Sequence, residues 1–183
     1  MLITLFKKEK IMKKILTTLL LTTLTTFAIN VGEVPKDVTL EGDNGGLVDG
    51  SAWSSSTLKD KVHVLFYVDP DKKGDNEAFI DALHAKNYDR EKYGSVAIIN
   101  LKATWLPNFA IEKKLKAKQE QFPQTTYAKD KTKYLVIEWE LADDASNVLV
   151  FGKDGRLLYS HTGAIEGEEM EKVFSVIDVN LDK

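Results

Sequence analysis

The stretch over residues 61–76 constrains the fold most strongly, because it joins an apolar run to a polar turn and then to a helical pattern. This order is typical of the first half of a βαβ unit. One face of the expected strand carries Val62, Val64, Phe66 and Val68, and the other carries His63, Leu65 and Tyr67. A strand that is apolar on nearly both faces belongs in the middle of a covered sheet. Ligands of open α/β sheets bind beyond the carboxyl ends of such strands, so residues 69–75 are the first place to look for a site.

The rest of the chain predicts one α/β domain. A helix capped by Asp75 should follow the central strand, and residues 93–101 should form a second, parallel strand. Turn chemistry at residues 42–46 predicts an N-terminal hairpin between residues 38–40 and 47–48. Further downstream the patterns predict a helix opened by Pro107, a half-buried strand over 134–141, a hairpin of 148–151 with 157–159, and a last helix after Gly167.

The amino terminus predicts export. Met12 is followed by two lysines, an apolar threonine-rich stretch and Ala28, which together indicate a signal peptide over residues 1–28 with Met12 as the true start. A membrane-spanning anchor is the alternative, but the stretch is short of the roughly 20 apolar residues that a span needs. We therefore expect a single domain over residues 29–183, located in the periplasm without a stable membrane anchor.

Charge and cysteine content exclude several classes of function. Removal of residues 1–28 leaves 20 basic and 27 acidic residues, a net charge of −7, and an acidic exported protein is a poor candidate for binding nucleic acid. The chain has no cysteine, which excludes disulfides, thiol catalysis and thiolate metal sites.

Several short phrases, in this order, resemble the YtfJ family of exported proteins. They are Trp53 with Leu58-Lys59-Asp60-Lys61-Val62, Ile99-Asn100, Trp139-Glu140-Leu141 with Ser146-Asn147-Val148, and Lys153-Asp154-Gly155-Arg156 with Gly163. The resemblance covers residues 31–177 and implies a thioredoxin-like fold, with helices on both sides of a mixed central sheet. Thioredoxins place Cys-x-x-Cys after the central strand and a cis-proline before the closing hairpin. Here these positions hold residues 69–75 and 145–147, which supply neither a cysteine pair nor that proline.

Two polar loops are expected to meet at the former redox position, residues 69–75 and residues 143–147. The candidate binding residues are Asp69, Asp71, Lys72, Asp75, Asn76, Asp143, Asp144, Ser146 and Asn147. Several carboxylates close together repel one another unless a cation or a basic partner lies between them. Asp69, Asp71 and Asp75 resemble the start of a calcium loop, although Lys73 stands at a ligand position and Ile80 where the closing glutamate belongs.

Two functions remain open from the sequence. The first is an interaction module that binds a protein partner or a small ligand at these loops and needs no cofactor. The alternative is a divalent-cation-binding protein or a metal-dependent hydrolase that uses the same aspartates. Catalysis has little support, because His63, His84 and His161 show no metal-binding spacing and no nucleophile or phosphate-loop motif is present.

Overall fold

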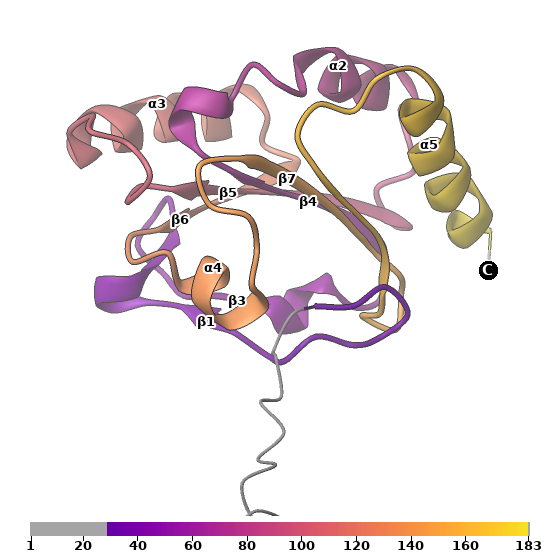
Figure 1. Ribbon diagram of the computed structural model, residues 1–183, viewed down its shortest axis with the longest axis horizontal. Coiled ribbons are helices and arrows are strands. Elements are labelled where there is room, and N and C mark those ends of the chain that lie inside the picture. Colours follow the sequence, from indigo (N-terminus) through magenta and orange to yellow (C-terminus); the bar gives the residue numbers. More distant parts are fainter. Residues whose placement is uncertain (1–28, 183) are drawn as a thin grey trace, which may run out of the picture.

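The computed structural model describes residues 29–182 and places a six-stranded mixed sheet at the centre of the molecule (Figure 1). The expected signal peptide lies outside the described residues. The strand order is β2-β6-β5-β4-β7-β8, in which β4, β5 and β6 are mutually parallel and the other pairings are antiparallel. The strands of this sheet are β2 (Gly45–Leu47), β4 (Val62–Val68), β5 (Tyr93–Asn100), β6 (Thr125–Asp130), β7 (Ser146–Phe151) and β8 (Leu157–Thr162).

Helices cover one face of the sheet, and a small sheet with a short helix covers the other (Figure 1). The first layer contains α2 (Glu77–Ala85), α3 (Asn108–Gln121) and α5 (Gly167–Leu181). The second contains α4 (Tyr134–Trp139) and the two-stranded sheet of β1 (Thr39–Leu40) and β3 (Trp53–Ser54). Short 3-10 helices lie at Gly42–Asn44, Ser55–Leu58 and Pro70–Lys72. Within residues 29–182, no helix combines the length and apolar character that crossing a membrane requires.

The central strand is β4, as its sequence predicts. All seven of its residues are buried. The face with Val62 and Phe66 packs against α2 and α5, and the face with Leu65 and Tyr67 packs against the layer of β1, β3 and α4. Pairing with β5 on one side and β7 on the other makes β4 an interior strand, so the prediction of a covered sheet is confirmed.

Two predicted elements differ from the structure near the amino terminus. The expected N-terminal hairpin does not form, because Leu40 pairs with Trp53 while Gly46 pairs with Lys129 of β6. The turn over 42–46 therefore passes the chain from one sheet to the other. Helix α2 begins one residue later than predicted, with Asn76 rather than Asp75 at the N-cap position.

The predicted strand over 134–141 is instead helix α4, and strand β6 precedes it unpredicted. The carboxylate of Asp130 accepts hydrogen bonds from the backbone N–H groups of Tyr134 (2.9 Å) and Leu135 (3.0 Å). These two N–H groups belong to the first helical turn, whose N–H groups have no hydrogen-bond acceptor within the helix itself. A residue outside the segment thus decides its conformation.

Candidate functional site

The two loops named by the sequence lie at the same edge of the sheet, beyond the carboxyl end of β4. Strand β7 runs antiparallel to β4, so Ser146 at its start lies opposite Val68 at the end of β4. The backbone N–H of Asp69 donates to the carbonyl of Ala145 at 3.0 Å. The topology that the sequence predicted therefore brings the loops together.

Asn76 joins three segments at this edge through its buried side chain. Its Nδ2 donates to Ser146 Oγ at 2.8 Å and to the Gly163 carbonyl at 2.9 Å, and its Oδ1 accepts from the Ile165 N–H at 2.8 Å. Asn76 and Ser146 are 2% and 1% exposed. Their polar atoms are used inside the protein, where they fix the start of α2 against β7 and the segment after β8.

Asn147 has a similar structural position. Its Nδ2 donates to the carbonyl of Ala142 at 2.9 Å, and its Oδ1 accepts from the Thr162 hydroxyl at 3.1 Å. The side chain is buried, so it holds the loop before β7 to the end of β8. Of the candidate residues, Asn76, Ser146 and Asn147 therefore support the loops from beneath.

Asp69 is a buried carboxylate at the start of the first loop. It accepts a hydrogen bond from the Asp71 N–H at 2.8 Å and caps the short helix Pro70–Lys72. Burial raises the pKa of the Asp69 carboxyl, and the nearby charges of Asp71 and Asp144 act in the same direction. The capping hydrogen bond lowers the pKa by less than these effects raise it.

Asp143 is held by a lysine and an amide. Its carboxylate forms an ion pair with Lys133, and it accepts from Asn100 Nδ2 at 3.1 Å. Burial raises the pKa of Asp143, but hydrogen bonds from Lys133, the Asp144 N–H and Asn100, together with the lysine charge, bring the net pKa below its ordinary value. The negative charge of Asp143 is thereby balanced by Lys133, and the hydrogen bond from Asn100 connects the second loop to the end of β5.

The remaining candidates are exposed and carry charge. They are Asp71, Lys72, Asp75 and Asp144. Within residues 29–182, no three His, Cys, Asp or Glu side chains are grouped so as to hold a metal ion. The cation site considered for Asp69, Asp71 and Asp75 thus gains no support from the geometry.

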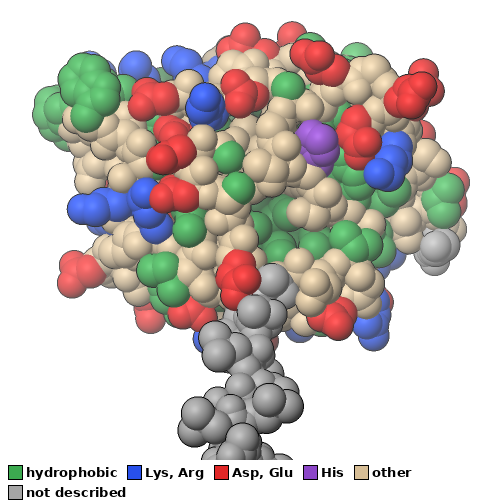
Figure 2. All heavy atoms as spheres, viewed as in Figure 1, with side chains coloured by type: hydrophobic (Ala, Val, Ile, Leu, Met, Phe, Trp, Pro, Cys, Tyr) green, Lys and Arg blue, Asp and Glu red, His purple; other side chains and the backbone are tan. Residues whose placement is uncertain are grey.

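Two exposed aromatic residues at this edge were missed by the sequence analysis. Trp105 and Phe109 are 85% and 75% exposed; Trp105 lies in the segment between β5 and α3, and Phe109 is the second residue of α3. Because β4 and β5 are parallel neighbours, residues 101–107 leave the sheet at the same edge as residues 69–75. Figure 2 shows hydrophobic side chains at the left end of the helical layer, with both acidic and basic side chains beside them. One signal was available: neither aromatic residue fits the buried stripe of Ile111 and Leu115 in α3.

We call this region the carboxyl-edge surface. It consists of exposed residues of the loops and of the start of α3, namely Asp71, Lys72, Lys73, Asp75, Lys102, Trp105, Phe109 and Asp144. Buried Asn76 and Asn147 hold the loops that carry its aspartates, so this part of the surface has a fixed support.

Comparison with known proteins places the chain in a family. The family model described as "Bacterial protein of unknown function (YtfJ_HI0045)" matches residues 30–180. This chain belongs to the YtfJ family. A relative, "Uncharacterized protein YtfJ" of Escherichia coli (strain K12), is 25% identical over 129 residues, which is 68% of this chain and 70% of the relative. The expected family resemblance is thereby confirmed.

Solved structures similar to this YtfJ-family chain share the thioredoxin-like fold. A putative thiol:disulfide interchange protein DsbE from Chlorobium tepidum has a TM-score of 0.58 at 17% identity, covering 84% of this chain and 99% of that one. A putative thioredoxin from Neisseria meningitidis has a TM-score of 0.57 at 15% identity, covering 81% and 89%. An uncharacterized conserved protein from Geobacillus kaustophilus has a TM-score of 0.60 at 16% identity, covering 86% and 84%. At these identities the likeness concerns the fold alone.

Proposed function

We propose that this member of the YtfJ family is an exported, periplasmic binding module without thiol redox activity, and that it docks a protein partner through the carboxyl-edge surface. The observation that carries the proposal is the exposure of Trp105 and Phe109 beside the two converging loops. Binding energy at protein interfaces is concentrated in a few side chains, among which tryptophan is enriched. Burying one such aromatic side chain contributes roughly 2–3 kcal/mol.

The charges around the aromatic pair favour a protein partner with a charged rim. Asp71, Asp75 and Asp144 are exposed at this edge, and so are the lysines Lys72, Lys73 and Lys102. Arginines or lysines on a protein partner would pair with the aspartates, and its carboxylates would pair with the lysines. Aromatic anchors at the centre and charges at the margin match the usual anatomy of an interface.

The absence of thiol chemistry rests on composition and on how the edge is filled. The chain has no cysteine, and a thiolate is the nucleophile in disulfide exchange. Where a thioredoxin carries its cysteine pair, this chain has Asp69 as a capping residue and Asn76 bonded to Ser146. Both features support a role in binding rather than in electron transfer.

Photo-crosslinking in living cells tests the proposal. A benzophenone amino acid at Phe109 preserves an aromatic side chain, a second at Lys72 samples the acidic loop, and Ser175 on the exposed side of α5 is the control position. We expect one discrete adduct from Phe109 and Lys72 and none from Ser175. Lys133 is unsuitable as a control, because it pairs with Asp143 next to the surface.

A variant separates docking from chance encounter. In the Trp105→Ala, Phe109→Ala double variant, a crosslinker at Lys72 should lose most of its adduct, since the aromatic anchors are gone while the loop is unchanged. Adducts of equal yield from Lys72 and Ser175, or an adduct that survives the double substitution, would contradict the proposal.

Export is tested separately. The N–H of Ile29 donates to the Trp139 carbonyl at 3.3 Å, so Ile29 already belongs to the folded domain, which supports cleavage after Ala28. We expect the mature protein in the periplasmic fraction, with an N-terminal residue of Ile29. Full-length protein retained in the cytoplasm would contradict this part of the proposal.

A further inference from the structure

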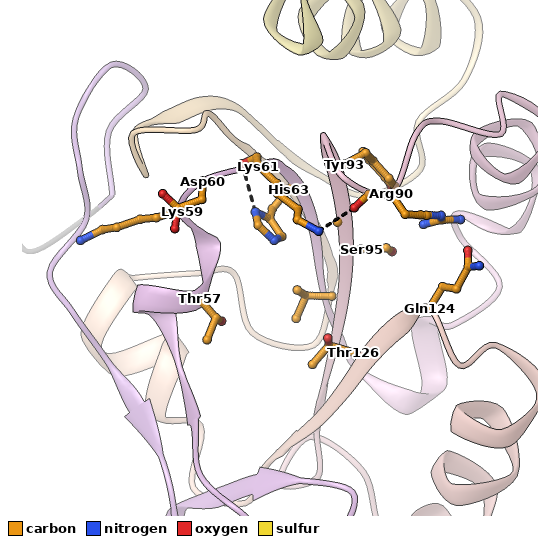
Figure 3. Close-up of a pocket in the computed structure, with 12 residues that line it drawn as sticks. Thr57, Lys59, Asp60, Lys61, His63, Arg90, Tyr93, Ser95, Gln124 and Thr126 are labelled. Carbon is orange, nitrogen blue, oxygen red and sulfur yellow. Dashed lines mark hydrogen bonds between the residues drawn. The ribbon is translucent and has the colours of Figure 1, made fainter.

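A hollow of about 450 Å³ lies at the amino-terminal ends of β4 and β5, at the opposite end of these strands from the carboxyl-edge surface (Figure 3). Its walls come from residues 57–61, from the starts of the two strands, and from residues 124–126. The volume is within the roughly 300–1,000 Å³ typical of small-molecule sites. Sequence analysis gave no sign of it, because its residues come from three separate segments, 57–63, 90–96 and 124–126.

His63 is the polar residue of a strand that is otherwise entirely apolar, and it lies in the wall of the hollow. Its ring packs directly on the backbone of Gly94 in the neighbouring strand. A Cβ at Gly94 would lie 2.4 Å from His63 Cδ2 and 2.5 Å from Nε2. Such distances are too short for any side chain, so the glycine makes room for the imidazole.

The protonation of His63 follows from its surroundings. Burial lowers the pKa of the imidazole, and the charge of Lys61 acts in the same direction, whereas Asp60 and the carbonyls of Lys61 and Leu58 raise the pKa by less. Neutral imidazole has one donor and one acceptor nitrogen. Nδ1 lies 3.1 Å from the Lys61 carbonyl oxygen and must donate to it. Nε2 is then the acceptor, and Figure 3 shows that edge of the ring turned toward the interior of the hollow.

Positive charge is concentrated around the hollow. Lys59, Asp60, Lys61 and Arg90 line it, and Figure 3 shows the charged ends of Lys59 and Asp60 directed away from it. Lys61 and Arg90 leave an excess of two positive charges, in a domain whose net charge is −7. The Lys61 ammonium is fixed, since its Nζ donates to the Arg90 carbonyl at 2.6 Å. The hydroxyl-bearing residues Thr57, Ser95 and Thr126 and the amide of Gln124 also line the hollow.

We propose that this hollow binds the phosphate monoester of a small polyol. A phosphate monoester carries about −1.5 to −2 charges at pH 7 and three acceptor oxygens, which matches the excess of two cations. Lysine and arginine are the side chains that recognise phosphate. The polyol part would donate a hydroxyl to His63 Nε2 and exchange hydrogen bonds with Thr57 and Thr126. The site is independent of the docking surface, because it uses the other end of the strands.

Titration followed by NMR tests the site with glycerol 3-phosphate as the probe. We expect saturable shifts confined to the amides of Gly94, Ser95 and Thr126. Glycerol lacks the charge and inorganic phosphate lacks the carbon-bound hydroxyls, so each should bind at least about tenfold more weakly. The absence of saturable shifts at these amides, or equal binding of inorganic phosphate, would overturn the proposal. Preference for the carboxylate gluconate would overturn the choice of phosphate.

Variants separate a built site from general attraction to lysines. Arg90→Gln removes a guanidinium that makes no hydrogen bond of its own in the described structure and contacts the Tyr93 ring, so folding should be preserved. It should weaken glycerol 3-phosphate binding on the order of tenfold. The control is Lys113→Gln, which changes the net charge equally on the exposed side of α3. Equal weakening by both variants would refute a specific site.

A variant of His63 tests the hydroxyl contact. His63→Phe keeps a flat ring on Gly94 and removes the acceptor nitrogen. It should reduce the affinity for glycerol 3-phosphate several-fold while leaving that for ethyl phosphate, which has no hydroxyl, unchanged. A parallel loss for both compounds would show that His63 acts only by shaping the wall, and the assigned hydrogen bond would be wrong.

Discussion

Removal of the Asp130 carboxylate should destabilise the fold more than any surface substitution. Asp130 is fully buried and accepts four hydrogen bonds, from the Tyr67 hydroxyl and from the N–H groups of Thr132, Tyr134 and Leu135, at 2.9–3.0 Å. It therefore joins the end of β6 to β4 and caps α4. In Asp130→Ala, all four donors lose their acceptor.

The size of the loss in the free energy of unfolding depends on which of the four donors stay buried. The bonds from Tyr67 and Leu135 are buried, whereas those from Thr132 and Tyr134 are partly exposed. A buried donor left unsatisfied costs about 1–3 kcal/mol, and loss of an N-cap costs about 0.5–2 kcal/mol. We expect Asp130→Ala to lower the free energy of unfolding by about 4 kcal/mol. That is a large part of the roughly 5–15 kcal/mol of a typical domain.

Two further variants should lower the free energy of unfolding by smaller amounts than Asp130→Ala. Asp130→Asn keeps one acceptor oxygen but turns an amide toward the remaining donors, so about 2 kcal/mol should be lost. Tyr67→Phe removes one of the four bonds and should cost about 1 kcal/mol. Asp154→Ala is the control, because its carboxylate pairs with Arg156 at an exposed turn, where an ion pair contributes about 0–1 kcal/mol. Urea unfolding followed by circular dichroism gives each value. If Asp130→Ala fell within about 1 kcal/mol of the wild type, the assigned role of this carboxylate would be refuted.

Three other substitutions test local features of the structure. Asp69→Asn should maintain or raise stability at pH 7, because burial raises the pKa of this carboxyl and an amide oxygen still accepts from the Asp71 N–H. Urea unfolding measures the difference in free energy of unfolding between the variant and the wild type. This difference should shrink as pH falls through the raised pKa, because the wild-type carboxyl then gains its proton. Gly94→Ala should cost about 1–3 kcal/mol through its clash with the imidazole, and less in a His63→Ala background, as thermal melts would reveal. Asn76→Ala loses three hydrogen bonds at once and should cost about 2–4 kcal/mol; a melting temperature equal to that of the wild type would contradict the role of this side chain.

The elements that were predicted correctly are those whose residue pattern fits only one type of secondary structure. Strand β4 is apolar at nearly every position, which only an interior strand of a covered sheet satisfies at this length. Helix α5 has a stripe of Val173, Ile177 and Leu181 that is buried at helical spacing. In both cases the local pattern and the tertiary packing require the same structure.

Helix α4 was mispredicted because its residue pattern fits both a strand and a helix. Leu135, Ile137 and Trp139 alternate as a strand would, but Leu135 and Trp139 are also four residues apart and share one face of a helix. The structure buries those two and leaves Ile137 65% exposed. Asp130 favours the helix over the strand, because its carboxylate accepts hydrogen bonds from the first helical turn. This contact cannot be inferred from the periodicity of the segment itself.

The candidate site was predictable in position but not in detail. Strand order places residues 69–75 and 143–147 at one edge, and this much follows from a thioredoxin-like topology. The partners of Asn76 lie 70 or more residues away in sequence, so its role as a buried support could not be separated from a role in binding. The same limit hid the hollow, where the fit between Gly94 and His63 exists only after β4 and β5 have paired.

The two ends of the central strands suit different kinds of ligand, and the reason lies in how each end is filled. At the carboxyl edge the space between the loops is occupied by Asn76 and Ser146, so what remains for recognition projects outward, as Trp105 does. Projecting aromatic side chains gain energy only when another macromolecule covers them. At the amino edge Gly94 makes room for the imidazole instead, and His63 with its cationic neighbours lines a volume that a small molecule would fill. A partner protein and a small anion would therefore not compete for the same atoms, and glycerol 3-phosphate should leave crosslinking at Phe109 unchanged.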